Sequence, residues 1–207
     1  MIKISLHLNP IEFGMNKEKV ISNLASLLKE TPSSLEVVKD DKHKAQRFRS
    51  LAEHMIERAI KRDALILSDD LNGIAILFEE NTGQKESFLS QIKADLKLAF
   101  KVTGISKGLR ALKIQGYVKN QRPKDEPHLY CWFWGIMPES RGPGGLRITY
   151  AMKDEIFRIS KERNLPVYAE TRIKKVMIAY VRYGFKIFNE WQHPSGDMMW
   201  FMRYDPK

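Results

Sequence analysis

The sequence of 207 residues holds a single cysteine, Cys131. One cysteine excludes an internal disulfide framework, and no motif places a histidine or an acid beside it, so we interpret it as a buried apolar side chain. The five histidines stand at positions 7, 43, 54, 128 and 193, without metal-ligand spacing, and we expect no metal site. The sequence also lacks the nucleophile-elbow motif that a Ser/His/Asp triad would use.

Long apolar runs are missing as well. The sequence has no apolar run of about 18 residues that would span a membrane, and its N-terminus lacks the basic start, apolar stretch and cleavage site of a secretion signal. We therefore expect a cytoplasmic protein with no membrane partner. A chain of this length with 43% apolar residues can bury one core, so we expect a single domain over residues 1–207.

Positive charge exceeds negative charge, and the net charge is +10. The excess is spread along the chain without a basic tail or block, so solvated basic faces explain it as well as a phosphate-binding surface does. We expect no specific nucleic-acid partner.

Hydrophobic periodicity predicts helices that alternate with strands. Asn16 is the expected N-cap of the first helix, and residues 119–127 are an expected linker into a central strand. The other predicted elements are a strand over residues 2–8, a helix over 48–59, a hairpin with strands over 64–67 and 73–78, and helices over 88–100 and 109–117, the last two covering the sheet.

A glycine-rich turn follows the central strand, which ends at Pro138. It reads Arg-Gly-Pro-Gly-Gly over residues 141–145, and helical spacing resumes after it. Glycine lets the backbone approach an anion closely, and the first amides of a helix have no partner within the helix, so such a turn can hold a phosphate. An ordinary turn between a strand and a helix is the alternative interpretation.

Two further segments follow this turn in a defined order. Residues 165–171 read Leu-Pro-Val-Tyr-Ala-Glu-Thr, and residues 180–185 read Tyr-Val-Arg-Tyr-Gly-Phe. With the strand end Ile-Met-Pro at 136–138, they resemble the motifs of the GCN5-related N-acetyltransferases. Arg141 and Gly144 match the phosphate-binding motif of that family, and Tyr180 matches its motif B.

The lead-in Pro-Lys-Asp-Glu-Pro-His over residues 123–128 is similar to that of the puromycin N-acetyltransferase type within the family. The family motifs cover about residues 123–204. The resemblance implies an α/β fold with a mixed, mostly antiparallel central sheet, helices on both faces, and splayed fourth and fifth strands. Residues 1–122 would supply the first strand, helices and hairpin of the same domain.

The resemblance implies an enzyme that moves an acetyl group directly from acetyl-CoA, its co-substrate, to the primary amine of a small molecule. The protein would act as a monomer or a homodimer. The pantetheine arm would pair with the end of strand four, and the pyrophosphate would lie on the turn. The implied cofactor-binding residues are Gly135, Ile136, Met137, Arg141, Gly142, Gly144, Gly145, Leu146 and Arg147, with the Ile136 amide as oxyanion donor.

Acetyl transfer also needs a base for the amine and an acid for the departing thiolate. Tyr180 matches the family tyrosine that protonates the thiolate, and its alternative role is that of a packing aromatic. His128 and Glu170 are the two candidates for the base. The alternatives are a histidine hydrogen-bonded to the linker and a glutamate that supports the structure near the site.

Alternate positions on strand four carry Tyr130, Trp132 and Trp134, which a regular strand would place on one sheet face. These three aromatic side chains would form either an apolar acceptor pocket or the core beneath a helix.

Three positions depart from the family pattern. Leu146 stands where the family has its second Gly or Ala, Pro143 where it often has Lys or Arg, and Val176 where an Asn is frequent. Pro143 has no N–H to donate to a phosphate. These departures support a second hypothesis, a catalytically degenerate protein of this fold that binds acyl-CoA or another ligand without turnover.

Overall fold

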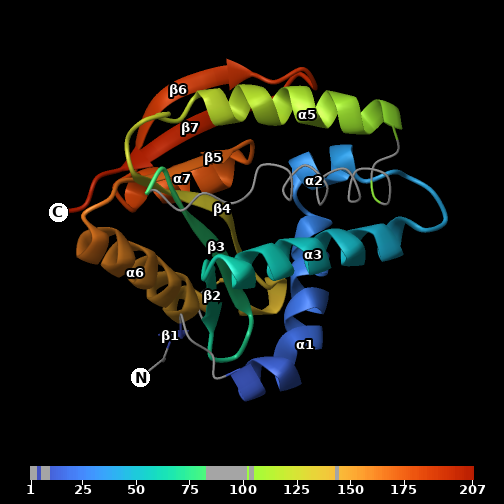
Figure 1. The fold of residues 1–207 in the computed structure, drawn as a ribbon, viewed down its shortest axis with the longest axis horizontal. Helices are drawn as coiled ribbons and strands as arrows, with labels where there is room; N and C mark the ends of the chain where they lie inside the picture. Colours follow the sequence, from blue (N-terminus) through green and yellow to red (C-terminus); the bar gives the residue numbers. More distant parts are fainter. Residues whose placement is uncertain (1–3, 6–9, 83–101, 103–104, 143–144) are drawn as a thin grey trace.

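The computed structural model describes residues 4–5, 10–82, 102, 105–142 and 145–207. A twisted sheet runs through the middle of the molecule, and helices cover both of its faces (Figure 1). Over the described residues the sheet has the strand order β1-β2-β3-β4-β5-β7-β6. The strands are β1 (Ile4–Ser5), β2 (Leu65–Ser68), β3 (Gly73–Glu80), β4 (His128–Ile136), β5 (Val167–Thr171), β6 (Lys186–Gln192) and β7 (Met198–Tyr204).

Neighbouring strands are antiparallel except for β4 and β5, which are parallel. The two parallel strands are connected through a helix, as a parallel pair requires. The predicted hairpin is present as β2 and β3. Because Leu71 adopts a positive φ of 63° between the two strands, the chain reverses there within a few residues.

One face of the sheet is covered by α1 (Pro10–Leu28), α2 (Pro32–Val37) and α3 (Lys44–Lys61). Leu24 of α1 and Ile56 of α3 are fully buried in a core that also contains Ile74 and Ile76 of β3. Such alternating positions of a strand share one face, so the intervening Ala75 and Leu77 point the other way.

The opposite face is covered by α6 (Leu146–Arg163) and α7 (Lys174–Arg182). Met152 and Ile156 of α6 are fully buried against Ala75, Leu77 and Met202. Burying β3 on both faces from Gly73 to Phe78 removes apolar surface from water and contributes about 25 cal/mol per Å². The centre of the sheet therefore lies between two apolar layers.

A third core lies beneath α5 (Ile105–Asn120), which covers β6 and β7. The predicted helix over 109–117 is present as part of α5. Leu109 and Leu112 are exposed, whereas Val118 packs on Met199 and Phe201. The apolar side chains of this helix do not all lie on one stripe, so the spacing alone did not identify the packed face.

The start of the first helix differs from the prediction. Asn16 is not an N-cap, because α1 begins at Pro10 and runs through position 16. Proline suits the first turn of a helix, since its missing N–H would have no partner there. Of the strand predicted over 2–8, the structure describes Ile4–Ser5, and the helix predicted over 88–100 lies outside the described residues.

Among the described helices, none is at once long and apolar enough to cross a membrane.

Candidate active site

The sheet opens between β4 and β5. These strands pair only at Leu129 with Val167 and at Tyr130 with Tyr168, although β4 continues to Ile136. Beyond Tyr130 the two strands are no longer hydrogen-bonded to each other, as the predicted splay requires.

A β-bulge lies at the start of the opening. Ile76 of β3 pairs with Phe133 while the next residue, Leu77, pairs with Cys131, so Trp132 has no partner residue in β3. The extra residue inverts the alternation of side chains along the rest of the strand. Trp132 therefore packs with α1 and α3, and Trp134 packs on the other face. The prediction that Tyr130, Trp132 and Trp134 share one face is wrong, because a regular strand was assumed.

Tyr180 of α7 borders the opening on the α6–α7 face. Its ring stacks between Trp134, at a centroid distance of 5.4 Å, and Phe185, at 5.0 Å. Burial raises the pKa of Tyr180 well above its ordinary value, and a hydrogen bond with the Cys131 thiol raises it further. Burial likewise raises the pKa of the Cys131 thiol to about 12. Both groups therefore stay protonated at neutral pH.

Glu170 borders the opening on the opposite face. Ala169 belongs to the core with Tyr180, so strand alternation directs Glu170 to the other side. The Tyr130 hydroxyl donates a hydrogen bond of 2.6 Å to Glu170 Oε1. Burial raises the pKa of Glu170 above its ordinary value, although Arg122 and Tyr130 oppose the rise. The charge of Glu170 in turn raises the pKa of Tyr180, so the two side chains interact across the opening.

His128 lies at the other end of β4, before the strands separate. It is 1% exposed, and its Nδ1 is 2.9 Å from the carbonyl oxygen of Glu126 in the linker. Its Nε2 is 3.4 Å from Glu80 Oε2. Since both ring nitrogens face protein groups at the closed end of the strand pair, the geometry matches the alternative interpretation, a histidine bonded to the linker.

The turn after β4 begins with a short 3-10 helix, η2 (Pro138–Ser140), and leads into α6. Gly142 has a φ of +89°, a conformation that favours glycine. A side chain at Gly145 is excluded, because its Cβ would lie 1.5 Å from the Ser140 carbonyl oxygen. Position 145 therefore requires a glycine, because the chain returns closely on itself there.

Several polar groups of this turn are already bonded within the protein. The Arg141 amide donates to Pro138 O at 3.1 Å, and the Gly145 amide donates to Gly142 O at 3.0 Å. The Arg141 side chain donates from Nε to Ile136 O and from Nη1 to Glu30, both at 2.7 Å. The carbonyl at the end of β4 is thus covered by Arg141.

The other predicted cofactor-binding residues lie around this turn. A Cβ at Gly135 would lie 2.8 Å from the tip of the Phe133 ring, which would have to shift, and Met137 is buried. Leu146 and Arg147 begin α6 and are exposed, and by helix geometry their amides have no partner within the helix. Gly144 and Pro143 lie outside the described residues. The assignment of these residues to a cofactor stays a prediction.

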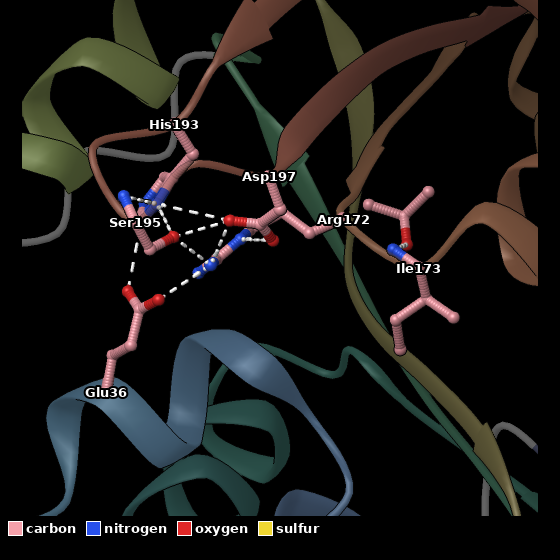
Figure 2. A network of polar contacts seen from close by, with 7 residues as sticks. Glu36, Arg172, Ile173, His193, Ser195 and Asp197 are labelled. Atoms are coloured by element: carbon pink, nitrogen blue, oxygen red, sulfur yellow. Dashed lines mark hydrogen bonds and ion pairs between the residues drawn. The ribbon is translucent and has the colours of Figure 1, made fainter.

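A second polar cluster lies at the end of β5, and sequence patterns gave no sign of it. Arg172 donates to Asp197 at 2.6 and 2.7 Å and to Glu36 of α2 at 2.6 Å (Figure 2). His193 Nδ1 is 2.6 Å from Ser195 Oγ, and Ser195 also contacts Asp197. The cluster joins α2 to the hairpin loop between β6 and β7.

This cluster contains metal-type ligands but is occupied by an arginine. Atoms of Glu36, His193 and Asp197 lie within 4.8 Å of one another. Arg172 Nη2, however, is 2.6 Å from an oxygen of each carboxylate, so its positive charge already stands where a cation would bind. Burial and the charge of Arg172 lower the pKa of His193, which keeps the imidazole neutral. The arrangement is an internal ion-pair cluster.

The sequence predictions missed Glu80 and Arg122 beside Glu170, and they did not place Tyr130 next to it. Arg122 was assigned to the linker, although it is 8% exposed and its guanidinium lies 3.5 Å from the centre of the Tyr130 ring. A lone arginine in a charged linker carries no pattern that indicates burial. Its partners come from β3, β4 and β5, which only the fold brings together.

Several solved structures have a similar fold. A Corynebacterium glutamicum protein described as histone acetyltransferase HPA2 and related acetyltransferase has a TM-score of 0.67 and 14% identity, covering 100% of this chain and 97% of that chain. Arylalkylamine N-acetyltransferase 2 from Aedes aegypti has a TM-score of 0.65 and 13% identity, covering 100% and 99%. The C-terminal condensation domain of Ebony, in complex with beta-alanyl-dopamine, has a TM-score of 0.64 and 11% identity, covering 99% and 100%. No family model and no curated protein sequence matches the chain.

Likenesses at such low identity establish the fold. The chain has the fold of the GCN5-related N-acetyltransferases, and the predicted fold class is confirmed. The similarity to the puromycin N-acetyltransferase type in particular stays a prediction.

Proposed function

We propose that the chain is an N-acetyltransferase that moves an acetyl group from acetyl-CoA to the primary amine of a small molecule, by direct transfer in a ternary complex. The observation that carries this proposal is the opening between β4 and β5, with Tyr180 on one face and Glu170 on the other. Fold neighbours described as acetyltransferases, one of them for arylalkylamines, support an amine as the acceptor.

The turn and the start of α6 fit an acyl-CoA phosphate group. The positive end of the helix dipole and the exposed Arg147 both favour negative charge at this place. We assign the pantetheine arm to the free edge of β4 over Gly135, Ile136 and Met137, where β5 has separated from it. Binding there requires Arg141 to release the Ile136 carbonyl.

Acetyl-CoA supplies the acetyl thioester. The amine nitrogen forms the new bond to the acetyl carbon as the carbon–sulfur bond breaks. Glu170 takes the proton that the nitrogen loses, directly or through a water, and Tyr180 donates its proton to the departing sulfur. We assign the base to Glu170 rather than to His128, because Glu170 lies in the opening and His128 at the closed end of the strand pair.

The second candidate function is binding of an acyl-CoA or another ligand without turnover. The hydrogen bonds already made within the turn favour this function. Arg141 covers the Ile136 carbonyl, and the Gly145 amide donates to Gly142 O. The presence of Tyr180 in the opening favours the enzyme.

Calorimetric titration with acetyl-CoA tests the proposal, with Leu146→Glu and Leu146→Gln as a matched pair. Leu146 is half exposed at the first position of α6, where either side chain fits and a glutamate suits the helix dipole. We expect micromolar binding that Leu146→Glu weakens at least about 10-fold and Leu146→Gln leaves nearly unchanged, because only the glutamate repels a pyrophosphate.

Thiol release in a screen of small amines separates the two functions. Binding together with thiol release supports the enzyme, and binding without release from any amine supports the second function. Absence of binding at millimolar acetyl-CoA would contradict the enzyme and would restrict the second function to another ligand.

A further inference from the structure

Four polar side chains cluster at the buried end of Glu170, on the α5 side of the sheet. Glu80 comes from the end of β3, Arg122 from the segment after α5, and His128 and Tyr130 from β4. Arg122 Nη1 is 3.9 Å from Glu170 Oε2, and Arg122 Nε is 3.5 Å from Glu80 Oε2. Glu80 Oε2 also faces His128 Nε2 at 3.4 Å.

The two oxygens of Glu170 are held differently. Oε1 accepts the short hydrogen bond of 2.6 Å from the Tyr130 hydroxyl. Oε2 has the guanidinium of Arg122 beyond hydrogen-bond distance, at 3.9 Å. The carboxylate is therefore fixed in direction through one oxygen, while the other keeps a lone pair for a proton.

Arg122 is held in an unusual way for a buried arginine. Its Nε and Nη1 atoms are buried and have no hydrogen-bond partner, and its guanidinium rests on the face of Tyr130 at 3.5 Å. Unpaired buried donors are costly, so an arginine retained for stability alone is expected to pair directly with its carboxylates. Arg122 instead supplies positive charge to both carboxylates without occupying their oxygens.

We infer that Tyr130 and Arg122 are positioning residues for the Glu170 base. The Tyr130 hydroxyl fixes one carboxylate oxygen, and the charge of Arg122 favours the ionised carboxylate while leaving the second oxygen free to take the proton of the amine. Glu80 holds Arg122 in this place from the other side. This inference rests on the proposed function for its catalytic meaning, and on the contacts above for its geometry.

The electrostatics agree in direction with this arrangement. Burial raises the pKa of Glu170, the charge of Glu80 raises it further, and Arg122 and Tyr130 lower it. On the other side of the opening, Cys131 and Tyr180 stay protonated and add no charge. Removing the Tyr130 hydroxyl should therefore raise the pKa of Glu170, and removing the Arg122 charge should raise it as well.

The test is a carbon-13 NMR titration of the full chain labelled at the glutamate side-chain carboxyl, with the Glu170 signal assigned from Glu170→Gln. We expect Tyr130→Phe to move the Glu170 titration upward by about 1 to 2 pH units, as loss of a hydrogen bond to a charged group would. Tyr168→Phe is the matched control. Tyr168 is a buried tyrosine opposite Tyr130 in β5, and it accepts a hydrogen bond from Arg203 rather than contacting Glu170.

Tyr130→Phe keeps the buried ring, so the test does not depend on the harsher Arg122→Gln variant. An unchanged Glu170 titration in Tyr130→Phe, or an equal shift in Tyr168→Phe, would overturn the inference.

The kinetic test is separate. If the chain transfers acetyl groups, the acid limb of the pH profile of kcat/KM should move upward with the NMR titration in Tyr130→Phe. A shifted titration in a protein that transfers no acetyl group would instead overturn the proposed function and leave the positioning geometry intact. Active enzyme with an unmoved acid limb would overturn the inference alone.

Discussion

Arg122 and Arg172 are both buried beside two carboxylates, and they are held in opposite ways. Arg172 donates hydrogen bonds of 2.6 to 2.7 Å to Glu36 and Asp197, and only its Nη1 lacks a partner. Arg122 stays 3.5 and 3.9 Å from Glu80 and Glu170, and both its Nε and its Nη1 lack partners.

The difference separates two uses of a buried charge. Close, directional bonds fix segments in place, and removing the arginine then leaves carboxylates unpaired. A charge held at a distance shifts the protonation of its neighbours and leaves their oxygens available. The Arg172 cluster therefore holds α2 on the β6–β7 loop, whereas the Arg122 cluster adjusts a candidate base.

The largest expected effect is a difference in kcat between variants of the two clusters. Glu170→Gln should lower kcat by about 100- to 10,000-fold, the usual contribution of general acid–base catalysis. Asp197→Asn, an acid-to-amide change in the other cluster, should leave kcat within about threefold of wild type, because Asp197 pairs with Arg172 and Ser195 away from the opening. Steady-state assays of thiol release at saturating acetyl-CoA measure both. Equal losses in the two variants would remove the functional distinction between the clusters.

For the free energy of unfolding, we expect the Arg172 cluster to matter most. Arg172→Met should lower the free energy of unfolding by about 2 to 4 kcal/mol, somewhat less than a fully buried pair because Glu36 and Asp197 are partly exposed. Arg158→Met is the control, since Arg158 also pairs with two acids, Glu155 and Glu162, but on the surface of α6. We expect the control to cost less than about 1 kcal/mol. Urea unfolding gives both values, and a similar cost for the two variants would contradict the assignment of Arg172 to a fixing role.

The pH dependence of stability should differ in sign between the clusters, with at most about 1.4 kcal/mol per pH unit for one group. Arg172 lowers the pKa of Asp197, so the stability that Asp197 contributes is present above the ordinary aspartate pKa of about 3.9 and is lost as the pH falls through its folded value. Burial raises the pKa of Glu170, so its favourable contribution is present below the ordinary glutamate pKa of about 4.3 and is lost as the pH rises through its folded value.

Unfolding measured from pH 3 to 7 for wild type, Asp197→Asn and Glu170→Gln should therefore show the two variants diverging from wild type in opposite directions. If the stability differences between variant and wild type changed with pH in the same direction for both variants, the described surroundings of Asp197 or of Glu170 would be wrong.

The smallest expected effect on the free energy of unfolding comes from changing one partner of Arg172, Glu36. Glu36→Gln keeps Asp197 as a close partner of Arg172, so it should cost only about 1 kcal/mol. The same urea experiment measures it. A cost as large as that of Arg172→Met would show that the bond to α2 carries nearly all of the stabilisation.

Local patterns in the sequence predicted much of this fold. Glycine and proline marked the turn after β4, and alternating apolar residues marked the β2–β3 hairpin, because backbone preferences act over a few residues. The order of the family motifs placed Tyr180 and Glu170 near one opening. The sequence alone left two candidates for the base, Glu170 and His128. A choice between them requires the position at which β4 and β5 separate, which only the structure gives.

Features that depend on distant partners were not predictable. The bulge at Trp132 is defined by the pairing of β4 with β3, so the sequence of β4 alone does not reveal it. Arg172 bonds to a residue 136 positions away, and Arg122 meets acids on two other strands. Such contacts are set by the packing of the whole chain, so periodicity and spacing cannot identify them.

The short pairing of β4 with β5 also has a consequence for the response of the protein to salt. Most neighbouring strands are joined along their length by backbone hydrogen bonds, whereas these two share only two residue pairs. Across the opening, the two halves of the molecule are joined by an apolar core, in which Trp134 stacks on Tyr180, and by buried polar contacts such as that of Glu36 with Arg172. Dissolved ions screen exposed charges over about 8 Å at physiological ionic strength, but they act only weakly on a charge as buried as that of Arg172. The width of the opening should therefore change little with ionic strength.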